Sequence, residues 1–293
     1  MAIKTHRLLN LSSGIASVSV ALALVALKAW ALSQTGSLAI AASLTDSGID
    51  LLVSLGGLMA IIYAARPPDA DHAFGHTSAE DLAALAQALI ILASAGLIGW
   101  AAIARIVRFE AAPLASEAEG IAVMLTSAAL TGALVLWQRF VARRTGNRVV
   151  AADQLHYIGD LLPTLGAIIA LLASATWGIG GIDSAVALIA AAYMAWGALR
   201  IGGGAWDALM DRTADPALVE SIAAIARDWP GVHGYHDLKT RTAGSRLFVY
   251  LHVELDGDQT LREAHAISAG LKRQILLKYP QADVIIHQDV ARD

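Results

Sequence analysis

Long apolar runs alternate with short polar segments along the chain up to about residue 208. A helix that crosses the hydrocarbon core of a membrane needs roughly 20 mostly apolar residues. Six runs are long enough, at about residues 8–32, 38–64, 80–106, 118–140, 150–176 and 182–208. The third is the clearest, because Leu82 to Ala104 contains no charged residue. Tryptophans lie near most of the run ends, as is typical of membrane interfaces. The pattern therefore predicts six transmembrane helices.

After Asp211 the pattern changes to that of a small soluble domain. Asp215 and Pro216 fit the N-cap and the first position of a helix. Gly244 lies between two alternating segments and indicates a β-hairpin. The predicted elements are a helix over about 216–228, strands over about 233–241 and 246–255, a helix over about 260–278, and a strand over about 283–288. We expect a membrane all-α domain over residues 1–210 and an α+β domain of order αββαβ over residues 211–293.

The composition supports a membrane protein. The chain has 293 residues, of which 56% are hydrophobic and 16% are charged, whereas soluble proteins contain about 25% charged residues. The net charge of -4 gives no indication of nucleic-acid binding. Because cysteine is absent, disulfides and thiolate ligands are excluded, and a metal site must use histidine, carboxylate, water or backbone atoms. Such donors suit zinc, cadmium, manganese, iron or cobalt better than copper(I).

Basic residues near the helix ends predict the orientation. Lys4 and Arg7 precede the first helix. Four arginines crowd the loop between the fourth and fifth helices, at positions 139, 143, 144 and 148, whereas the loop before it contains glutamates. Basic loops stay in the cytoplasm, so an even number of spans places both termini there. The first apolar run is long and ends without a cleavage motif, so we expect a true span and not a signal peptide.

Two pairs of ionisable residues interrupt the apolar runs at the same spacing. Asp46 and Asp50 lie in the second helix, and His156 and Asp160 lie in the fifth. At this spacing both side chains of a pair leave the same helix face. Ionisable groups in membranes usually face the bundle interior and mark an ion path. Tetrahedral zinc accepts nitrogen and oxygen ligands, so the two helices could form a four-ligand site. The alternative is that these are polar residues at helix ends or facing water.

Such a site would also exchange protons. Three carboxylates packed together without a cation repel one another, so at least one should bind a proton when the metal leaves. Metal and protons then compete for the same atoms, which is a physical basis for antiport.

The loop between the second and third helices contains a second group of metal-ligand types. Asp69, His72 and His76 lie within eight residues of one another, and Asp71 could replace Asp69. From spacing alone, a three-ligand metal site and a solvated polar loop are equally compatible with this segment.

A third group lies in the predicted soluble domain, where five of the nine histidines are found. The candidate ligands are His236, His252, His265, His287 and Asp289. His287 and Asp289 are two residues apart on a strand and so share one face. A carboxylate such as Asp289 could bridge two ions. Surface histidines without a metal remain the alternative.

Short sequence motifs that include these residues occur in both predicted domains. The membrane part contains Ser-Leu-Thr-Asp-Ser-x-x-Asp at 43–50, Asp-x-x-His-x-Phe-Gly-His at 69–76 and Asp-x-Leu-His-Tyr-x-x-Asp at 153–160. The remainder adds Leu-Met-Asp-Arg at 209–212, Trp-Pro-Gly-Val at 229–232, His-Asp-Leu at 236–238 and Val-Ile-Ile-His-Gln-Asp at 284–289. Together they resemble the cation diffusion facilitator family, and within it the bacterial zinc/ferrous-iron efflux branch.

The resemblance implies a homodimer of six-helix protomers in the bacterial inner membrane, with a metallochaperone-like cytoplasmic domain. It also implies that metal is exchanged for protons. By position, the transport site would be Asp46, Asp50, His156 and Asp160. The loop site would be Asp69, His72 and His76. A cytoplasmic two-metal site would use His236, His252, His287 and a bridging Asp289, with His265 in or beside it.

One position departs from the family pattern. The branch often has a lysine shortly after the loop histidine, where it pairs with an aspartate at the end of the sixth helix and locks the dimer. This chain has Thr77 and Ser78 there, while the aspartate is kept as Asp211. The interlock is therefore weaker than in the branch or is formed by another residue.

We hypothesise a membrane antiporter, not an enzyme, that exports Zn²⁺ in exchange for protons, with Cd²⁺ and Fe²⁺ as other candidate substrates. The expected partners are a second copy of the chain and membrane lipid. One rival interpretation is an intramembrane metalloenzyme, but four protein ligands leave no position for a catalytic water. Another is a membrane-anchored metal sensor, which predicts binding without flux.

Overall fold

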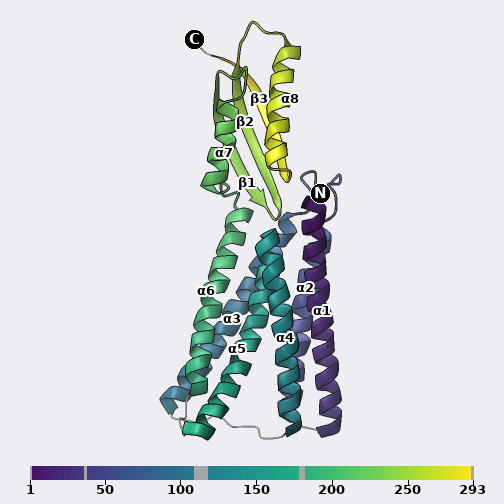
Figure 1. Ribbon diagram of the computed structural model, residues 1–293, viewed down its shortest axis with the longest axis vertical. Coiled ribbons are helices and arrows are strands. Elements are labelled where there is room, and N and C mark those ends of the chain that lie inside the picture. Colours follow the sequence, from purple (N-terminus) through teal and green to yellow (C-terminus); the bar gives the residue numbers. More distant parts are fainter. Residues whose placement is uncertain (1, 36–37, 109–117, 178–181, 292–293) are drawn as a thin grey trace. The chain divides into compact units, whose positions relative to one another are not determined.

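The computed structural model describes residues 2–35, 38–108, 118–177 and 182–291. The chain divides into two compact units. Thr5–Trp206 forms one unit, and Asp207–Asp293 belongs to the other. The first unit is helical, and the second contains a three-stranded sheet with two helices (Figure 1).

Among the residues that the structure describes, six long helices form the first unit. They are α1 (Ala2–Thr35), α2 (Leu38–Ala64), α3 (Ser78–Arg108), α4 (Ala118–Thr145), α5 (Arg148–Trp177) and α6 (Ile182–Leu209). Over the described residues, five of them are long and apolar enough to cross a membrane. The first half of α5 contains Arg148, Asp153 and Asp160. The predicted helical membrane domain is confirmed.

Outward-facing apolar side chains fit this membrane assignment. Leu97 and Trp100 on α3 are 71% and 74% exposed, and similar side chains lie along the outer faces of the other helices. Lipid is as apolar as these side chains, so helices in membranes associate through close packing and small residues. The interface of α5 with α6 is an example: a Cβ on Gly197 would lie 2.7 Å from Leu155 Cδ2.

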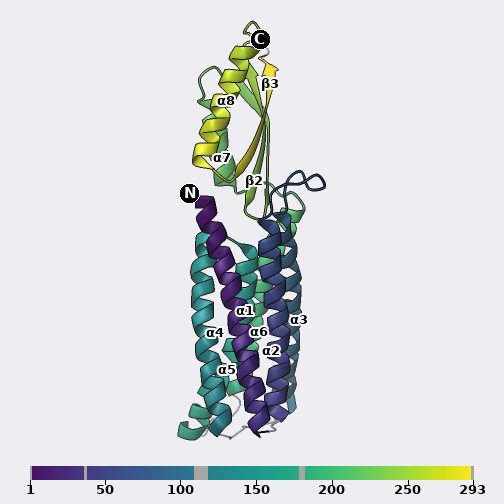
Figure 2. The same cartoon turned by 90° about the vertical axis from the view of Figure 1, so that its right-hand side faces the viewer.

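Within the bundle, α5 packs against α2, α3 and α4. The helices lie side by side along the bundle (Figures 1 and 2). This packing places the first half of α5, with its ionisable residues, next to the middle of α2. Asp50 of the first predicted pair therefore meets both residues of the second pair across one interface.

The second unit has the predicted αββαβ order. Its elements are α7 (Pro216–Arg227), β1 (Gly234–Ala243), β2 (Arg246–Leu255), α8 (Leu261–Lys278) and β3 (Ala282–Val290). The strand order is β1-β2-β3, with β1 antiparallel and β3 parallel to the central strand. A parallel neighbour needs a crossover, and α8 provides it. The predicted α+β fold is confirmed.

Alternation along β2 separates the two faces of this sheet. Leu247, Val249, Leu251, Val253 and Leu255 are buried and form the core with residues of α7 and α8. Both helices lie on this face (Figure 2). The residues between them, including those at 252 and 254, point to the opposite face because side chains alternate along a strand. That face has no helix of this unit over it among the described residues.

Both helices of this unit begin at predicted capping residues. Asp215 accepts a hydrogen bond from the N–H of Ala217, with Pro216 at the first helical position. Thr260 forms a capping box with Glu263, in which each side chain binds the backbone N–H of the other.

Loss of the Thr260 cap gives a first testable prediction. Thr260→Ala is expected to lower the free energy of unfolding of this unit by about 0.5–2 kcal/mol, because an N–H at the start of α8 loses its acceptor. Hydrogen exchange of the sheet amides in the full-length protein measures the change. Thr260→Ser, which keeps the hydroxyl, is the matched control and should lose much less. Equal exchange in the alanine variant and the wild type would contradict the assigned cap.

Candidate metal sites

The bundle brings three predicted ligands together. Asp50 on α2 and His156 and Asp160 on α5 each offer one atom, and these atoms all lie within 4.8 Å of one another. His156 Nε2 lies 3.0 Å from Asp50 Oδ1. Ligand atoms around one tetrahedral zinc lie about 3.3–3.6 Å apart, given bonds of about 2.0–2.2 Å. A small adjustment of the side chains would therefore let these atoms bind one ion.

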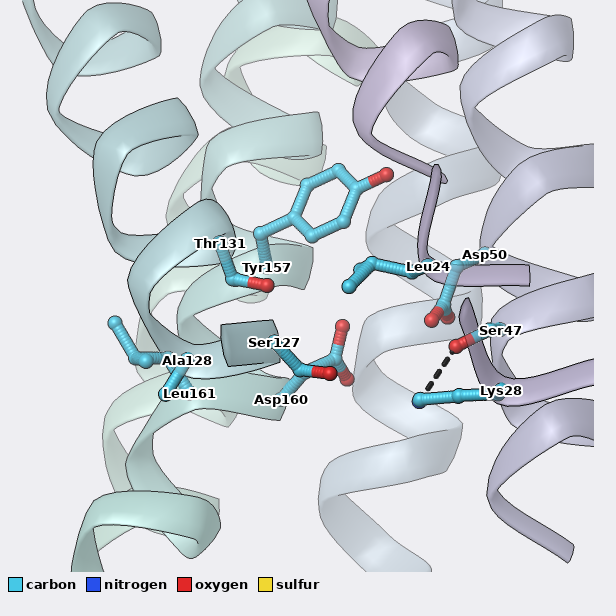
Figure 3. Close-up of a pocket in the computed structure, with 10 residues that line it drawn as sticks. All are labelled: Leu24, Lys28, Ser47, Asp50, Ser127, Ala128, Thr131, Tyr157, Asp160 and Leu161. Atoms are coloured by element: carbon cyan, nitrogen blue, oxygen red, sulfur yellow. Dashed lines mark hydrogen bonds between the residues drawn. The ribbon is translucent and has the colours of Figure 1, made fainter. Parts of the chain in front are cut away.

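A small cavity adjoins these residues. Its volume is about 70 Å³, which is enough for a few water molecules. Four helices line it, with Leu24 and Lys28 from α1, Ser47 and Asp50 from α2, Ser127, Ala128 and Thr131 from α4, and Tyr157, Asp160 and Leu161 from α5. In Figure 3 the carboxylates of Asp50 and Asp160 point into the same space from opposite helices. The candidate ligands Asp50 and Asp160 thus line an internal space together with polar side chains.

Asp46 is placed differently from the other predicted ligands. Its side chain is exposed, and it is not part of the three-residue group among the described residues. A residue four positions before Asp50 lies about 6 Å away along the helix axis. Asp46 is still close enough to Asp160 for their charges to interact. The structure therefore groups three of the candidate ligands, with a fourth carboxylate one turn away.

Polar side chains beside the site were not among the predicted ligands. Tyr157 Oη lies 2.9 Å from Ser54 Oγ, and Ser54 is hydrogen-bonded at 2.8 Å to Ser17 on α1. Gln138 Nε2 donates to Asp153 Oδ2 at 2.7 Å. Buried polar groups need such partners, especially in a membrane. Isolated polar positions within apolar runs were the signal that could have identified them.

The loop residues also come together. Asp69 Oδ1 lies 3.2 Å from His72 Nδ1, and Asp69 Oδ2 lies 3.2 Å from His76 Nε2. The three residues form a group whose ligand atoms lie within 4.8 Å of one another. His76 is buried against the Tyr63 ring, whereas Asp69 and His72 are exposed. Asp71 is not part of the group among the described residues.

Hydrogen bonds hold the loop carboxylate in place. The backbone N–H of His72 donates to Asp69 Oδ1 at 2.7 Å. This bond is the main reason that the pKa of Asp69 lies below its usual value, and the imidazoles of His72 and His76 lower it further. The carboxylate is therefore ionised over the physiological range, as a metal ligand must be.

The strand register brings the third group of candidate metal ligands together, on the face of the sheet that α7 and α8 do not cover. His236 on β1 lies opposite His252 on β2, and His252 lies opposite His287 on β3. Three imidazoles therefore form a row across the sheet. Two residues further along, Glu254 lies opposite Asp289 on the same face.

Asp289 contacts all three histidines. Its Oδ2 lies 2.8 Å from His252 Nδ1 and 3.3 Å from His236 Nε2, while its Oδ1 lies 3.3 Å from His287 Nε2. The hydrogen bond with His252 is the main reason that the pKa of Asp289 is lowered, and the other two imidazoles add to the effect. A carboxylate with different histidines on its two oxygens has the geometry of a bridging ligand.

Glu254 and His265 differ from the sequence prediction. Glu254 Oε1 lies 3.0 Å from His236 Nδ1, so it is a further candidate ligand that was not predicted. Its position two residues after His252 was the available signal. His265 lies on α8 with an exposed side chain, and is not part of the group among the described residues. Because α8 covers the opposite face of the sheet, this histidine cannot join the row.

Asp211, the aspartate of the predicted interlock, pairs with an arginine of its own unit. Arg241 Nη1 lies 2.8 Å from Asp211 Oδ1. Asp211 has a φ of 57°, and Arg212 N donates to Asp207 O while Asp211 N donates to Ala208 O. These bonds form a Schellman motif, in which glycine is usual at the left-handed position. Arg241 is thus an ion-pair partner of Asp211 within this unit.

Two family models match this chain. The cation efflux transmembrane domain matches residues 14–210, and the cytoplasmic domain of cation efflux proteins matches residues 214–291. Together they span nearly all described elements of both units.

Full-length relatives show the same similarity. The cation-efflux pump FieF of Klebsiella pneumoniae (strain ATCC 700721 / MGH 78578) is 39% identical over 277 residues, which cover 94% of this chain and 91% of the relative. FieF of Pectobacterium carotovorum subsp. carotovorum is 40% identical over 283 residues, covering 97% and 93%. Among solved structures, the metal-bound C-terminal domain of the CzcD transporter from Thermotoga maritima is 25% identical. It covers 25% of this chain and 87% of that chain, with a TM-score of 0.25.

Proposed function

Because the chain belongs to the cation diffusion facilitator family of cation efflux transporters, we propose that it exports Zn²⁺ from the cytoplasm in exchange for protons. Transporters of this family move divalent metal ions and are not enzymes, so the metalloenzyme interpretation is set aside. The observation that supports this proposal most directly is the grouping of Asp50, His156 and Asp160 between two helices of a membrane bundle.

The donor set of this group suits zinc. One imidazole nitrogen and two carboxylates match common zinc ligands, and a fourth position would be filled by water or by Asp46 after a small movement of α2. Cadmium and ferrous iron accept the same ligand types and are secondary candidates. Manganese, which prefers oxygen ligands, fits less well beside His156.

Proton exchange follows from the same atoms. Metal binds only the deprotonated imidazole and carboxylates, so its arrival displaces protons and its departure lets them return. Asp50 and Asp160 point into one cavity, where two negative charges without a cation would repel each other. Alternate opening of this cavity to the two sides of the membrane would couple the two fluxes in opposite directions.

The two further groups are proposed as additional metal sites. Asp69, His72 and His76 would bind one ion at the end of the bundle where α2 ends. The row of histidines on the sheet would bind two ions, with Asp289 bridging them and Glu254 as an added ligand. Metal there would neutralise the facing carboxylates of two C-terminal domains and draw the domains of a homodimer together. Residues 1–210 would transport, and residues 211–293 would regulate.

The orientation is proposed from charge and from the family. The loop between α4 and α5 contains four arginines, at positions 139, 143, 144 and 148, and such loops stay in the cytoplasm. The model that matches residues 214–291 describes a cytoplasmic domain. Both termini would then lie in the cytoplasm and the bundle in a bacterial inner membrane, as the similarity to FieF pumps supports.

Zinc uptake by proteoliposomes tests the proposal. Wild-type protein reconstituted with a trapped zinc dye should admit zinc at a rate that saturates with zinc concentration, while protein-free vesicles should not. Zinc binding to the purified protein is measured in parallel. Binding without uptake would contradict transport and favour the membrane-anchored sensor.

A further inference from the structure

A lysine lies inside the long apolar helix α1, beside the proposed transport site. Lys28 Nζ donates to Ser47 Oγ at 2.6 Å and to the backbone oxygen of Ser43 at 3.2 Å, both on α2. The side chain is half-buried and lines the same cavity as Asp50 and Asp160. Figure 3 shows its ammonium end directed at Ser47, below the Asp50 carboxylate.

The surroundings of this ammonium group are mainly acidic. Asp50, Asp160 and Asp46 all lie close enough to attract it. A charged side chain within a membrane is costly unless it pairs with opposite charge or faces a polar cavity, and Lys28 lines a cavity that Asp50 and Asp160 also line. Its hydrogen bonds fix it to the turn of α2 that contains Asp46, so it stays beside the ligands instead of extending to the membrane surface.

A simple charge count shows what this lysine does. When ionised, Asp46, Asp50 and Asp160 together contribute three negative charges, and a protonated Lys28 contributes one positive charge. With a neutral His156 as ligand, the group then has a net charge of about -2, which a divalent cation cancels. Without the lysine, the same ion would leave one negative charge uncompensated in a low-dielectric site, and its release would be slower.

We propose that Lys28 is a charge-matching residue of the transport site, which sets the affinity for a divalent cation low enough for rapid release. The inference rests on the proposed transport at Asp50, His156 and Asp160. Lys28 donates hydrogen bonds to Ser43 and Ser47 of α2, so we infer that it acts on the site through its charge and its position beside α2.

A purely structural role makes a different prediction. If Lys28 only ties α1 to α2, any side chain that donates to Ser47 should replace it. Glutamine keeps an N–H donor but has no charge, whereas arginine keeps both. The pair Lys28→Gln and Lys28→Arg therefore separates charge from tethering.

Zinc uptake kinetics test the proposal. Lys28→Gln is expected to lower KM for zinc about tenfold, because a repelling charge near the ion is lost, and to lower the maximal rate because release slows. Lys28→Arg, which keeps the charge, should have a KM and a maximal rate close to those of the wild type. Lys272→Gln, on the exposed face of α8, is the matched control and should leave both unchanged. A KM for Lys28→Gln that is unchanged or higher would overturn the proposal.

A binding measurement covers poor folding of the variant. Purified Lys28→Gln that elutes as folded protein should bind zinc about tenfold more tightly than the wild type, because the repelling charge is lost. Equal or weaker binding by the folded variant would contradict charge matching. If the wild type itself takes up no zinc, the proposed function fails. If the wild type transports normally and only the Lys28 comparison shows no effect, this inference alone fails.

Discussion

Asp50→Asn is expected to reduce zinc uptake by more than about 100-fold, since even residues that only orient a metal ligand change metal affinity by about 10–100-fold. Asparagine has nearly the same size as aspartate but lacks the charge. It would leave His156 and Asp160 as the remaining members of the group. Uptake into proteoliposomes at several zinc concentrations measures the loss. Asp283→Asn, on an exposed position of β3, is the matched control and should transport normally.

The same assay measures how much the fourth carboxylate, Asp46, contributes to zinc uptake. Asp46 is exposed and lies outside the three-residue group, so Asp46→Asn should reduce uptake less than Asp50→Asn does. An equal loss in the two variants would mean that Asp46 moves into the site as a full ligand during transport. Normal uptake in Asp50→Asn would contradict the placement of the path between α2 and α5.

Zinc is expected to protect the sheet of the C-terminal domain strongly against hydrogen exchange. At a zinc concentration about 100 times the dissociation constant, binding stabilises the folded domain by about 2.7 kcal/mol. Amides of β2 that exchange through unfolding of the domain should then exchange about 100-fold more slowly. Addition of a chelator should reverse the effect.

His252→Ala should remove most of this protection. His252 is central in the row, with its Nδ1 2.8 Å from Asp289 Oδ2 and its ring 4.6 Å from that of His287. His233→Ala is the matched control, because its side chain is exposed and lies outside the group. Equal protection by zinc in His252→Ala and the wild type would show that the row of histidines is not the metal site.

The fold was largely predictable because its signals are local. Each apolar run that is long enough for a membrane appears as one helix, from α1 to α6. In the C-terminal domain, Asp215 and Pro216 mark the start of α7, and Gly244, with a φ of 53°, occupies the predicted turn between β1 and β2. The i,i+4 spacing of His156 and Asp160 likewise predicted that both side chains would leave α5 on one face.

The parts that were not predicted depend on contacts between elements. Lys28 appears in the sequence as one charge in an apolar run, and only packing of α1 against α2 places it beside Ser47. Glu254 becomes a candidate ligand because strand register sets it next to His236. The pairing of Asp211 with Arg241 likewise joins residues far apart in the chain. Spacing alone contains no information on these contacts.

In the proposed antiport, zinc and protons move in opposite directions through Asp50, His156 and Asp160. Proteoliposomes that contain both a zinc dye and a pH dye test it most directly, with the wild type and Asp50→Asn compared side by side. We expect that zinc enters as protons leave, that an imposed proton gradient drives zinc accumulation, and that Asp50→Asn shows neither flux. Zinc entry without proton movement, or both fluxes at the wild-type rate in Asp50→Asn, would contradict it.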